Sequence, residues 1–274
     1  MCLLSVIIPV YNNVTYISSA IENYLSQHCL ESELIVIDGG SNDGTKEVIE
    51  GYANENPSIK WISEKDFGQS DAMNKGIGIA EGKYISFLNV DDYYSDGCLN
   101  EVCSILNKNP SIKYLVGNCK VWDKFGELIY INRPSKVKKW EVFSGYHFSV
   151  NPTAYFYLKS LHDQVGYYSN NNHYNMDLEM ILRFREVTNF HYYAKEWGNF
   201  RLLPNAKTFQ DQESNQLEQR KDALIKSFVE KQTLYIKLRV FIYRLRRTKI
   251  QQSIYFIRRV KDKGQYEFSK LFKK

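Results

Sequence analysis

The sequence predicts an α/β protein whose centre is an open, mostly parallel sheet flanked by helices. Two observations lead to this class. Over the first ninety residues, short apolar runs alternate with segments whose apolar residues recur at helical spacing. Each strand–helix–strand step requires parallel pairing and a right-handed crossover, so helices cover both faces of the sheet. Polar clusters also follow the expected strands, at the edge where ligands of such sheets bind.

The elements of the first half follow from the positions of apolar and turn-forming residues. The helix expected at residues 14–27 has apolar side chains at 14, 17, 20, 21, 24 and 25, which share one face. The turn-rich run Asp38-Gly-Gly-Ser-Asn-Asp-Gly44 introduces the next helix, and Ser41 or Asp43 can cap it. Strands are expected at residues 4–10, 34–37, 59–63 and 83–88, and helices at residues 14–27, 43–52 and 70–80.

The pattern after residue 95 is mixed. A helix at residues 99–107, a strand at 112–119 and a helix at 176–186 are expected, with irregular strands and loops over residues 120–155. Beyond residue 211 the chain is helical and basic, with a second short helical segment at 250–260. We therefore expect one domain at residues 1–210, with halves at 1–94 and 95–210, and a helical tail at residues 211–274.

Composition narrows the class of protein. With 43% hydrophobic and 15% aromatic residues, the chain of 274 residues can bury a core, which excludes a disordered protein. The five cysteines are odd in number and include no CxxC pair. This argues against a disulfide framework and a zinc site and is typical of the reducing cytoplasm. The apolar start lacks the basic region and cleavage site of a signal peptide, so a buried strand is expected there.

The net charge of +5 is unevenly distributed along the chain. Residues 220–274 contain 17 Lys and Arg against 4 Asp and Glu, whereas residues 1–219 contain 19 against 27. In this tail, Lys237, Arg239 and Arg244 alternate with aliphatic and aromatic residues, which predicts an amphipathic helix at an anionic membrane surface. A helix that packs on the domain or self-associates is the alternative. Nucleic acid is not an expected partner, because no recognition motif accompanies the charge.

The fourth expected strand ends abruptly in polar residues, at Asn89, Asp91 and Asp92. Strand interiors cannot hold bare carboxylates cheaply, so these acids are expected at a rim where something pairs with them. A divalent metal carrying a phosphorylated ligand is one such partner, because Mg²⁺ and Mn²⁺ take one or two carboxylates plus phosphate oxygens. The alternative is an acidic turn that caps the next helix.

The sequence contains no glycine-rich loop for binding phosphate. Gly76-Ile-Gly78 comes within one residue of the pattern GxGxxG, but it lies at the end of an expected helix and not at a strand-to-helix turn. The pattern GxxxxGK[ST] is also missing. If phosphate is bound, we therefore expect a metal to hold it.

Four segments of the first half occur in order: Ser5-Val-Ile-Ile-Pro-Val-Tyr-Asn12, Val36-Ile-Asp-Gly-Gly-Ser-Asn-Asp-Gly-Thr45, Asp71-Ala-Met-Asn-Lys-Gly76 and Phe87-Leu-Asn-Val-Asp-Asp92. In these segments the chain resembles family 2 glycosyltransferases of the GT-A fold, which are inverting enzymes that use nucleotide-sugars. Four motifs in register are far more specific than any single pattern. The likeness continues more loosely to about residue 208 and implies a Rossmann-like nucleotide-binding half with a C-terminal helical extension.

The resemblance implies that residues 1–94 bind the nucleotide-sugar and that residues 95–210 form the acceptor side. Pro9, Tyr11 and Asn12 would form the wall of the base pocket, with the Tyr11 ring against the base. Asp38 would accept hydrogen bonds from the base, and a role in an Asx-turn is compatible with this.

The segment Asn89-Val-Asp-Asp92 corresponds to the DxD-type motif of the family. The resemblance implies that Asp91 contacts the ribose or the metal and that Asp92 ligates the metal or lies beside it. The metal would be Mn²⁺ or Mg²⁺. Asn89 stands where Asp is commoner in the family. Its amide can still bond a ribose hydroxyl, but one negative charge is lost.

The family pattern also implies that residues around the third helix help to form the donor site. These are Asp66, Asp71 and Asn74. Lys75 is either a phosphate ligand or an ordinary solvated lysine.

The acceptor side would carry the catalytic base. The segment Tyr174-Asn-Met-Asp-Leu-Glu-Met-Ile-Leu-Arg183 resembles the family's acidic segment, with Met176 in place of its first acid, and this makes Asp177 the expected base. The alternative for Asp177 is a helix N-terminal acid favoured by the dipole. His147 would line the acceptor cleft or serve as a hydrogen-bonded loop residue.

The implied activity is inverting transfer from a nucleotide-diphosphate sugar, most commonly a UDP-sugar, to a saccharide or lipid-linked saccharide. The implied setting is cell-surface polysaccharide synthesis at the inner face of the cell membrane. Two other classes stay open. One is a nucleotidyltransferase, although the first loop lacks the expected glycines and lysines. The other is an inactive scaffold that binds nucleotide-sugar or a membrane.

Overall fold

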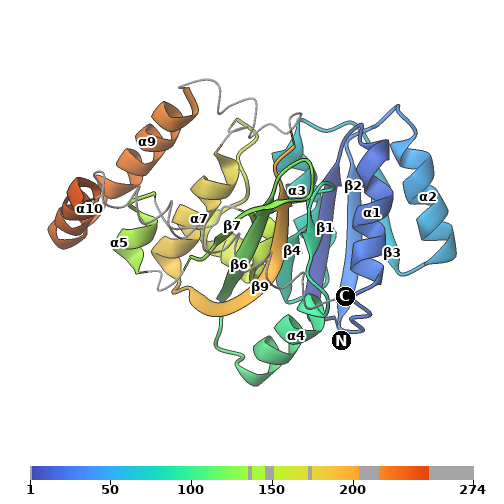
Figure 1. Ribbon diagram of the computed structural model, residues 1–274, viewed down its shortest axis with the longest axis horizontal. Helices are drawn as coiled ribbons and strands as arrows, with labels where there is room; N and C mark the ends of the chain where they lie inside the picture. The colour runs from blue at the N-terminus through green and yellow to red at the C-terminus, as the bar shows by residue number, and fades with distance from the viewer. Residues whose placement is uncertain (1, 135–137, 146–150, 172–174, 204–215, 247–274) are drawn as a thin grey trace.

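A mixed sheet forms the centre of the molecule in the computed structural model, which describes residues 2–134, 138–145, 151–171, 175–203 and 216–246 (Figure 1). Over these residues the sheet has nine strands, in the order β3-β2-β1-β4-β8-β6-β9-β5, with β7 paired to β6. Helices flank the sheet, as the sequence predicts, and the α/β fold class is confirmed.

The first half of the chain forms the parallel part of the sheet. Its strands are β1 (Leu4–Val10), β2 (Ser32–Asp38), β3 (Ile59–Ser63) and β4 (Tyr84–Phe87), and its helices are α1 (Val14–Leu25), α2 (Thr45–Glu55) and α3 (Gln69–Ile79). Every residue of β1 is buried, as expected for a strand covered on both faces. Ile7 packs in one apolar cluster with Met73 of α3, whereas Val6 packs in another with Ile17 of α1. Side chains alternate between the two helical layers.

The second half extends the sheet with antiparallel strands and one further parallel strand. Its elements are β5 (Tyr93–Tyr94), α4 (Cys98–Lys108), β6 (Tyr114–Trp122), β7 (Leu128–Asn132), α5 (Lys139–Val142), β8 (Tyr155–Leu158), α6 (His162–Val165), α7 (Met176–Val187) and β9 (His191–Arg201). β8 pairs antiparallel with both β4 and β6, and β9 runs parallel to β6. The irregular region predicted at 120–155 thus contains the end of β6, all of β7 and α5, and the start of β8.

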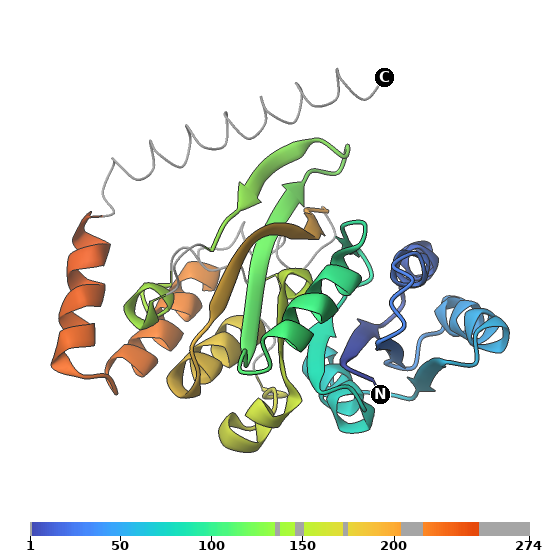
Figure 2. The same cartoon turned by 90° about the horizontal axis from the view of Figure 1, so that it is seen from below.

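Two helices follow at the end of the molecule opposite α2 (Figures 1 and 2). They are α9 (Gln216–Val229) and α10 (Leu234–Arg246), and the second segment predicted at 250–260 lies outside the described residues. Ile225 of α9 and Val240 of α10 are buried in the same apolar cluster as Ile7. The described part of the tail, helices α9 and α10, therefore packs on the body. No helix in the described part of the chain is long and apolar enough to cross a bilayer.

A substitution at Gly117 of β6 tests the packing between β6 and β9. A Cβ at this position would lie 2.3 Å from Cε3 of Trp197 and 2.9 Å from the carbonyl oxygen of Lys195. The β6–β9 register also shifts here, between Val116 and Asn118. We expect Gly117→Ala to lower the free energy of unfolding by about 1–3 kcal/mol, because the backbone must move to admit the methyl group.

The matched control is Gly51→Ala in α2, where a Cβ would meet no atom within 4 Å. This change should raise the free energy of unfolding by about 0.5–1 kcal/mol, because alanine favours the helix. Urea denaturation measures both values. Equal effects of the two changes would contradict the described packing of β6 on β9.

Candidate active site

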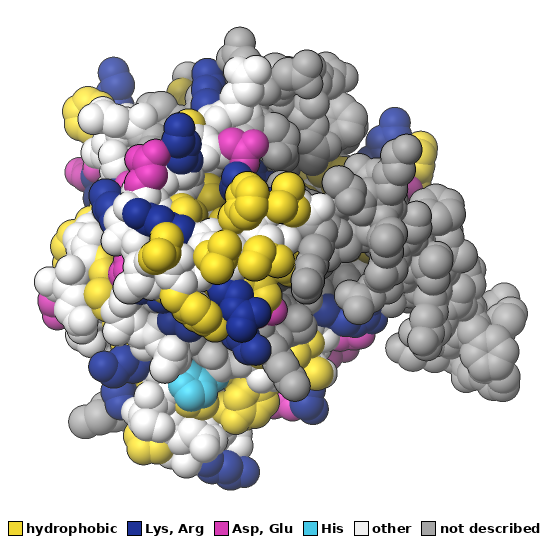
Figure 3. Space-filling view, turned by 90° about the vertical axis from the view of Figure 1, so that its left-hand side faces the viewer, with side chains coloured by type: hydrophobic (Ala, Val, Ile, Leu, Met, Phe, Trp, Pro, Cys, Tyr) yellow, Lys and Arg dark blue, Asp and Glu magenta, His cyan; other side chains and the backbone are white. Residues whose placement is uncertain are grey.

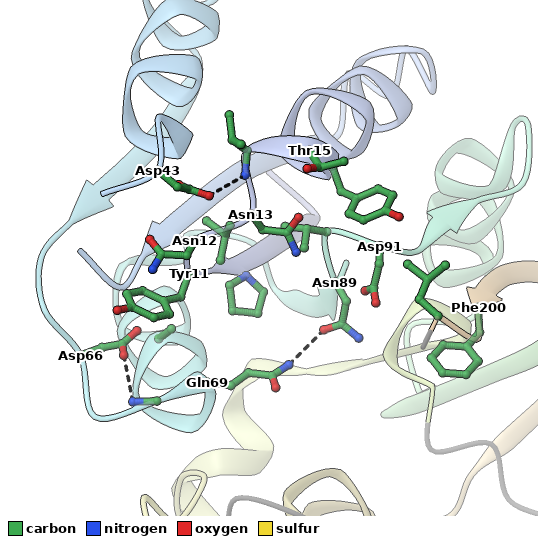
Figure 4. Close-up of a pocket in the computed structure, with 18 residues that line it drawn as sticks. Tyr11, Asn12, Asn13, Thr15, Asp43, Asp66, Gln69, Asn89, Asp91 and Phe200 are labelled. Carbon is green, nitrogen blue, oxygen red and sulfur yellow. Dashed lines mark hydrogen bonds between the residues drawn. The ribbon is translucent and has the colours of Figure 1, made fainter. Parts of the chain in front are cut away.

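A pocket of about 630 Å³ opens at the carboxyl ends of the parallel strands (Figure 4). Its walls come from the end of β1 and the start of α1, the loop before α2, the start of α3, the residues after β4 and the end of β9. The lining residues are 9–16, Asp43, Asp66, Gly68, Gln69, Ala72, 89–91, Phe200 and Leu203.

The pocket brings together six of the predicted site residues: Pro9, Tyr11, Asn12, Asp66, Asn89 and Asp91. The remaining described ones, Asp38, Asp71, Asn74, Asp92 and Asp177, are not in the lining. His147 lies outside the described residues.

The loop after β1 presents Tyr11 to the pocket. Asn12 has a φ of 46°, in the left-handed region that Asn tolerates better than most residues. The Asn12 backbone N–H donates to Ser41 Oγ at 2.7 Å, and the Asn42 N–H donates to Asn12 Oδ1 at 2.9 Å. These bonds fix the loop against its neighbour, while the Tyr11 ring stays 62% exposed. A flat ring in this position can stack on a nucleotide base.

Asp38, at the end of β2, is fully buried and already hydrogen-bonded. Its carboxylate accepts bonds from the Ser41 backbone N–H at 3.1 Å, from the Ser41 hydroxyl and from the Ser63 hydroxyl at 2.7 Å. In this geometry Asp38 therefore acts as the Asx-turn residue that the sequence analysis gave as compatible with base binding. Bonding to a base would require Asp38 to exchange some of these contacts, and that role stays a prediction.

Asp43 organises the starts of two helices. Its Oδ2 accepts the Val14 N–H at 3.1 Å (Figure 4), and its Oδ1 accepts the Thr45 N–H at 3.0 Å. These hydrogen bonds, led by that from the Thr45 hydroxyl, lower the pKa of the Asp43 carboxyl. The carboxylate is therefore ionised at neutral pH and faces the pocket as a capping group.

The loop after β3 carries Asp66, whose Oδ1 accepts the Gly68 N–H at 2.8 Å (Figure 4). Asp71 points elsewhere, because it accepts the Phe67 N–H at 3.2 Å and lies 3.4 Å from the ammonium group of Lys75. Lys75 also pairs with Glu64 at 2.9 Å, so two acids already neutralise the lysine.

Asn74 links the two halves of the chain. Its Nδ2 donates to the carbonyl of Tyr168 at 2.9 Å, and its Oδ1 accepts the Tyr168 N–H at 3.0 Å. The donor and the acceptor of the Asn74 side-chain amide thus both bond a residue that lies 94 positions later in the sequence. In this structure Asn74 holds the segment around Tyr168 against α3 and does not line the pocket.

Of the two acids after β4, Asp91 faces the pocket and Asp92 faces the interior. Asp92 is 2% exposed and accepts bonds from Asn89 Nδ2 at 3.2 Å, the Arg201 N–H at 3.2 Å and Asn151 Nδ2 at 3.4 Å. Burial raises the pKa of the Asp92 carboxyl well above its ordinary value, and the charge of Asp91 raises it further.

Asp91 is partly buried beside Asn89 on one side of the pocket (Figure 4). Burial raises the pKa of its carboxyl, and the positive charge of Arg201 opposes the rise. No cation lies within salt-bridge distance of Asp91 in the described part of the chain. A neighbouring cation would therefore stabilise two carboxylates that burial and mutual repulsion now disfavour.

The donors present fit a divalent metal that also binds phosphate. Among the described residues, no group of three or more His, Cys, Asp and Glu is arranged to hold a metal by itself. Mg²⁺ and Mn²⁺ sites with phosphorylated ligands use one or two carboxylates and take the other ligands from phosphate and water. Asp91 supplies one such carboxylate. Asp92 could supply a second only by turning from its present partners.

Asp177 is the second residue of α7 and lies over a group of buried tyrosines. Burial raises the pKa of its carboxyl to about 7, and a hydrogen bond from the Tyr155 hydroxyl, at 3.3 Å from Oδ1, acts in the opposite direction. The Ser70 hydroxyl donates to Met176 Sδ at 3.1 Å. Since Ser70 follows Gln69, which lines the pocket, the start of α7 lies next to the pocket.

Several lining residues were not predicted from the sequence. Gln69 Nε2 donates to Asn89 Oδ1 at 3.1 Å, and its position between Asp66 and Asp71 was the available signal. Phe200 reaches the pocket from β9, a strand that the mixed pattern of the second half did not predict, and Leu203 reaches it from just after the end of this strand.

Residues 5–146 match the sequence profile described as glycosyl transferase family 2. The chain belongs to this family. The chain spans 20% of the length of one curated relative, from Rickettsia bellii, and 75% of another, from Rickettsia prowazekii. The chain is 30% identical over 159 residues to the GalNAc(5)-diNAcBac-PP-undecaprenol beta-1,3-glucosyltransferase of Campylobacter jejuni. This alignment covers 54% of this chain and 50% of that protein.

Solved structures of glycosyltransferases share the fold. S. aureus TarS 1-349 in complex with UDP-GlcNAc superposes with a TM-score of 0.66 at 17% identity, over 86% of this chain and 69% of TarS 1-349. The mannosyltransferase PcManGT of Pyrobaculum calidifontis, in complex with GDP-Man and Mn²⁺, superposes with a TM-score of 0.59 at 12% identity, over 94% and 84% of the two chains. The GT-A fold expected from the sequence is confirmed.

The raised pKa of Asp177 can be tested by measuring how its replacement changes the free energy of unfolding at different pH values. Below about pH 4 an aspartic acid is protonated in both the folded and the unfolded chain. Between that pH and about 7, the unfolded chain releases the proton while the folded chain keeps it, so this group lowers stability as pH rises. We expect Asp177→Asn to stabilise the protein at pH 8, by up to about 4 kcal/mol.

Urea denaturation of both proteins at pH 5 and pH 8 measures this difference. The stabilisation by Asp177→Asn should shrink toward pH 5, because the wild-type carboxyl is then mostly protonated in the folded state. A difference that is the same at both pH values would show that the pKa is not raised.

Proposed function

We propose that this protein transfers a sugar from a nucleotide-diphosphate sugar to a saccharide or lipid-linked saccharide, with inversion, in cell-surface polysaccharide synthesis. The observation that carries the proposal is the charge of the pocket. Among the described lining residues, Asp43, Asp66 and Asp91 are carboxylates and none is Lys or Arg. A diphosphate in this pocket therefore needs a cation that the described walls do not provide.

Asp91 would hold this cation, with Asn89 beside it and Asp92 behind it. Mn²⁺ or Mg²⁺, when bound, neutralises charge on a diphosphate leaving group. The presence of Mn²⁺ with GDP-Man in PcManGT supports a metal of this class. Asn89 would orient a ribose hydroxyl through its amide by exchanging its present bond to Asp92 or from Gln69.

The wall formed by Pro9, Tyr11 and Asn12 would receive the nucleotide base. Tyr11 offers an exposed ring for stacking, and Asp38 lies at the neighbouring strand end. The complex of TarS with UDP-GlcNAc supports UDP as the nucleotide. The name of the Campylobacter jejuni relative, which includes PP-undecaprenol, supports a lipid-linked acceptor, and the predicted location at the inner face of the membrane stays a prediction.

Asp177 would act as the base that accepts the proton of the attacking acceptor hydroxyl. A carboxyl with a pKa of about 7 is ionised in a large fraction of molecules at neutral pH and is far more basic than a solvated aspartate. Inversion then follows from a single displacement at the anomeric carbon, and no covalent intermediate on the enzyme is needed. Tyr155 would hold the carboxylate in place through its hydroxyl.

Two substitutions separate these roles. Asp91→Asn and Asp177→Asn should each lower the rate of transfer by about 100-fold or more, because one removes the charge that holds the metal and the other removes the base. Only Asp91→Asn should weaken the binding of UDP in the presence of Mn²⁺. Release of UDP from UDP-sugars measures transfer, and calorimetry measures binding.

The matched control is Asp96→Asn, which changes an exposed acid outside the pocket and should keep full activity. Wild-type protein that binds nucleotide-sugar but transfers and hydrolyses none would indicate an inactive scaffold. Full activity of Asp177→Asn would refute its role as the base.

A further inference from the structure

Helix α10 presents an apolar strip to solvent. Leu234, Leu238, Phe241 and Leu245 are 82%, 54%, 60% and 58% exposed, and their spacing of four, three and four residues places them along one side of the helix. Figure 3 views the side of the molecule that carries α10, where hydrophobic side chains gather with Lys and Arg side chains beside them. A contiguous apolar surface of this kind marks a site of interaction.

The opposite side of α10 is fixed to the body of the protein. Ile236 and Val240 pack on the main apolar cluster, and the ring of Tyr243 lies 5.1 Å from that of Trp140 in α5. These contacts set the rotation of the helix about its axis. The apolar strip therefore faces outward because the helix is docked, and it cannot turn inward without breaking the contacts.

Basic residues border the strip and indicate what covers it. The α10 sequence LYIKLRVFIYRLR contains no acidic residue, and Lys237 and Arg239 are both exposed. The following residues, 247–274, contain 9 Lys and Arg against 2 Asp and Glu. An apolar face bordered by cations is typical of helices that lie in the interface of an anionic bilayer. A second copy of this surface would instead bring like charges together.

We propose that the strip formed by Leu234, Leu238, Phe241 and Leu245 inserts into the headgroup region of an anionic phospholipid bilayer, with Lys237 and Arg239 against the lipid phosphates. This goes beyond the predicted basic tail, because it assigns the contact to one face of a docked helix. The binding itself does not depend on the proposed transfer reaction. Its consequence, that the enzyme is held near a lipid-linked acceptor, does rest on that reaction.

Sedimentation of the full chain with vesicles tests the proposal. The protein should sediment with vesicles of phosphatidylcholine and phosphatidylglycerol and should bind vesicles of phosphatidylcholine alone much more weakly. Leu238→Ser/Phe241→Ser should reduce binding to the anionic vesicles by about tenfold or more, because two inserted side chains are lost. Lys237→Glu/Arg239→Glu should reduce it as well, and more strongly at low salt.

The matched control is Leu30→Ser/Phe125→Ser, which removes two side chains that are 100% and 78% exposed away from α10 and should bind vesicles like the wild type. Transfer to a soluble acceptor should be unchanged in Leu238→Ser/Phe241→Ser, which separates membrane contact from the reaction. Failure of the wild type to sediment, or equal sedimentation of Leu238→Ser/Phe241→Ser, would overturn the proposal. A dimer that this double change abolishes would assign the strip to a second copy instead.

Discussion

The site depends on two adjacent carboxylates held at the end of β4. Asp92 is fixed by a bond from neighbouring Asn89 and by bonds from Asn151 and from the backbone of Arg201, which come from two distant parts of the chain. This network buries the carboxyl group of Asp92 and leaves the carboxyl group of Asp91 beside it at the pocket. Two such charges in a poorly solvated place disfavour each other, and a cation relieves both. In the proposed function, this unfavourable arrangement of two acids underlies the binding of a metal.

The second half of the chain completes the site through a few specific contacts with the first. Asn74 bonds both backbone groups of Tyr168, and Ser70 bonds Met176 at the start of α7. Helix α7, which carries Asp177, is thereby placed beside α3, whose start lines the pocket. The two parts of the proposed reaction, leaving-group stabilisation and proton removal, are held together by this interface.

The sequence predicted the first four strands and three helices well, because a parallel sheet covered on both faces needs continuous apolar runs separated by amphipathic helices. It did not predict β9, whose residues His191–Arg201 mix charged, aromatic and small side chains in a strand that is exposed at one end and buried near the other. Phe200 was therefore missed as a lining residue. Such a strand is set by its neighbours more than by its own pattern.

The sequence predicted where the site residues lie in the fold more reliably than it predicted the directions of their side chains. The end of β4 was expected at a rim, and Asp91 lies there. The inward direction of the Asp92 side chain could not be predicted from the sequence. Its partners Asn151 and Arg201 lie about sixty and a hundred residues away along the chain. The same holds for Asp38, whose carboxylate bonds Ser63 on the next strand. Side-chain direction at a strand end depends on such long-range contacts.

The central claim is that the acids after β4 bind a cation that compensates a diphosphate. Calorimetric titration of UDP into the wild-type protein, with Mn²⁺ and then with a chelator, tests it most directly. The account predicts UDP binding that is at least about tenfold tighter with Mn²⁺, because the described walls of the pocket are acidic. Equal affinity under the two conditions would contradict it.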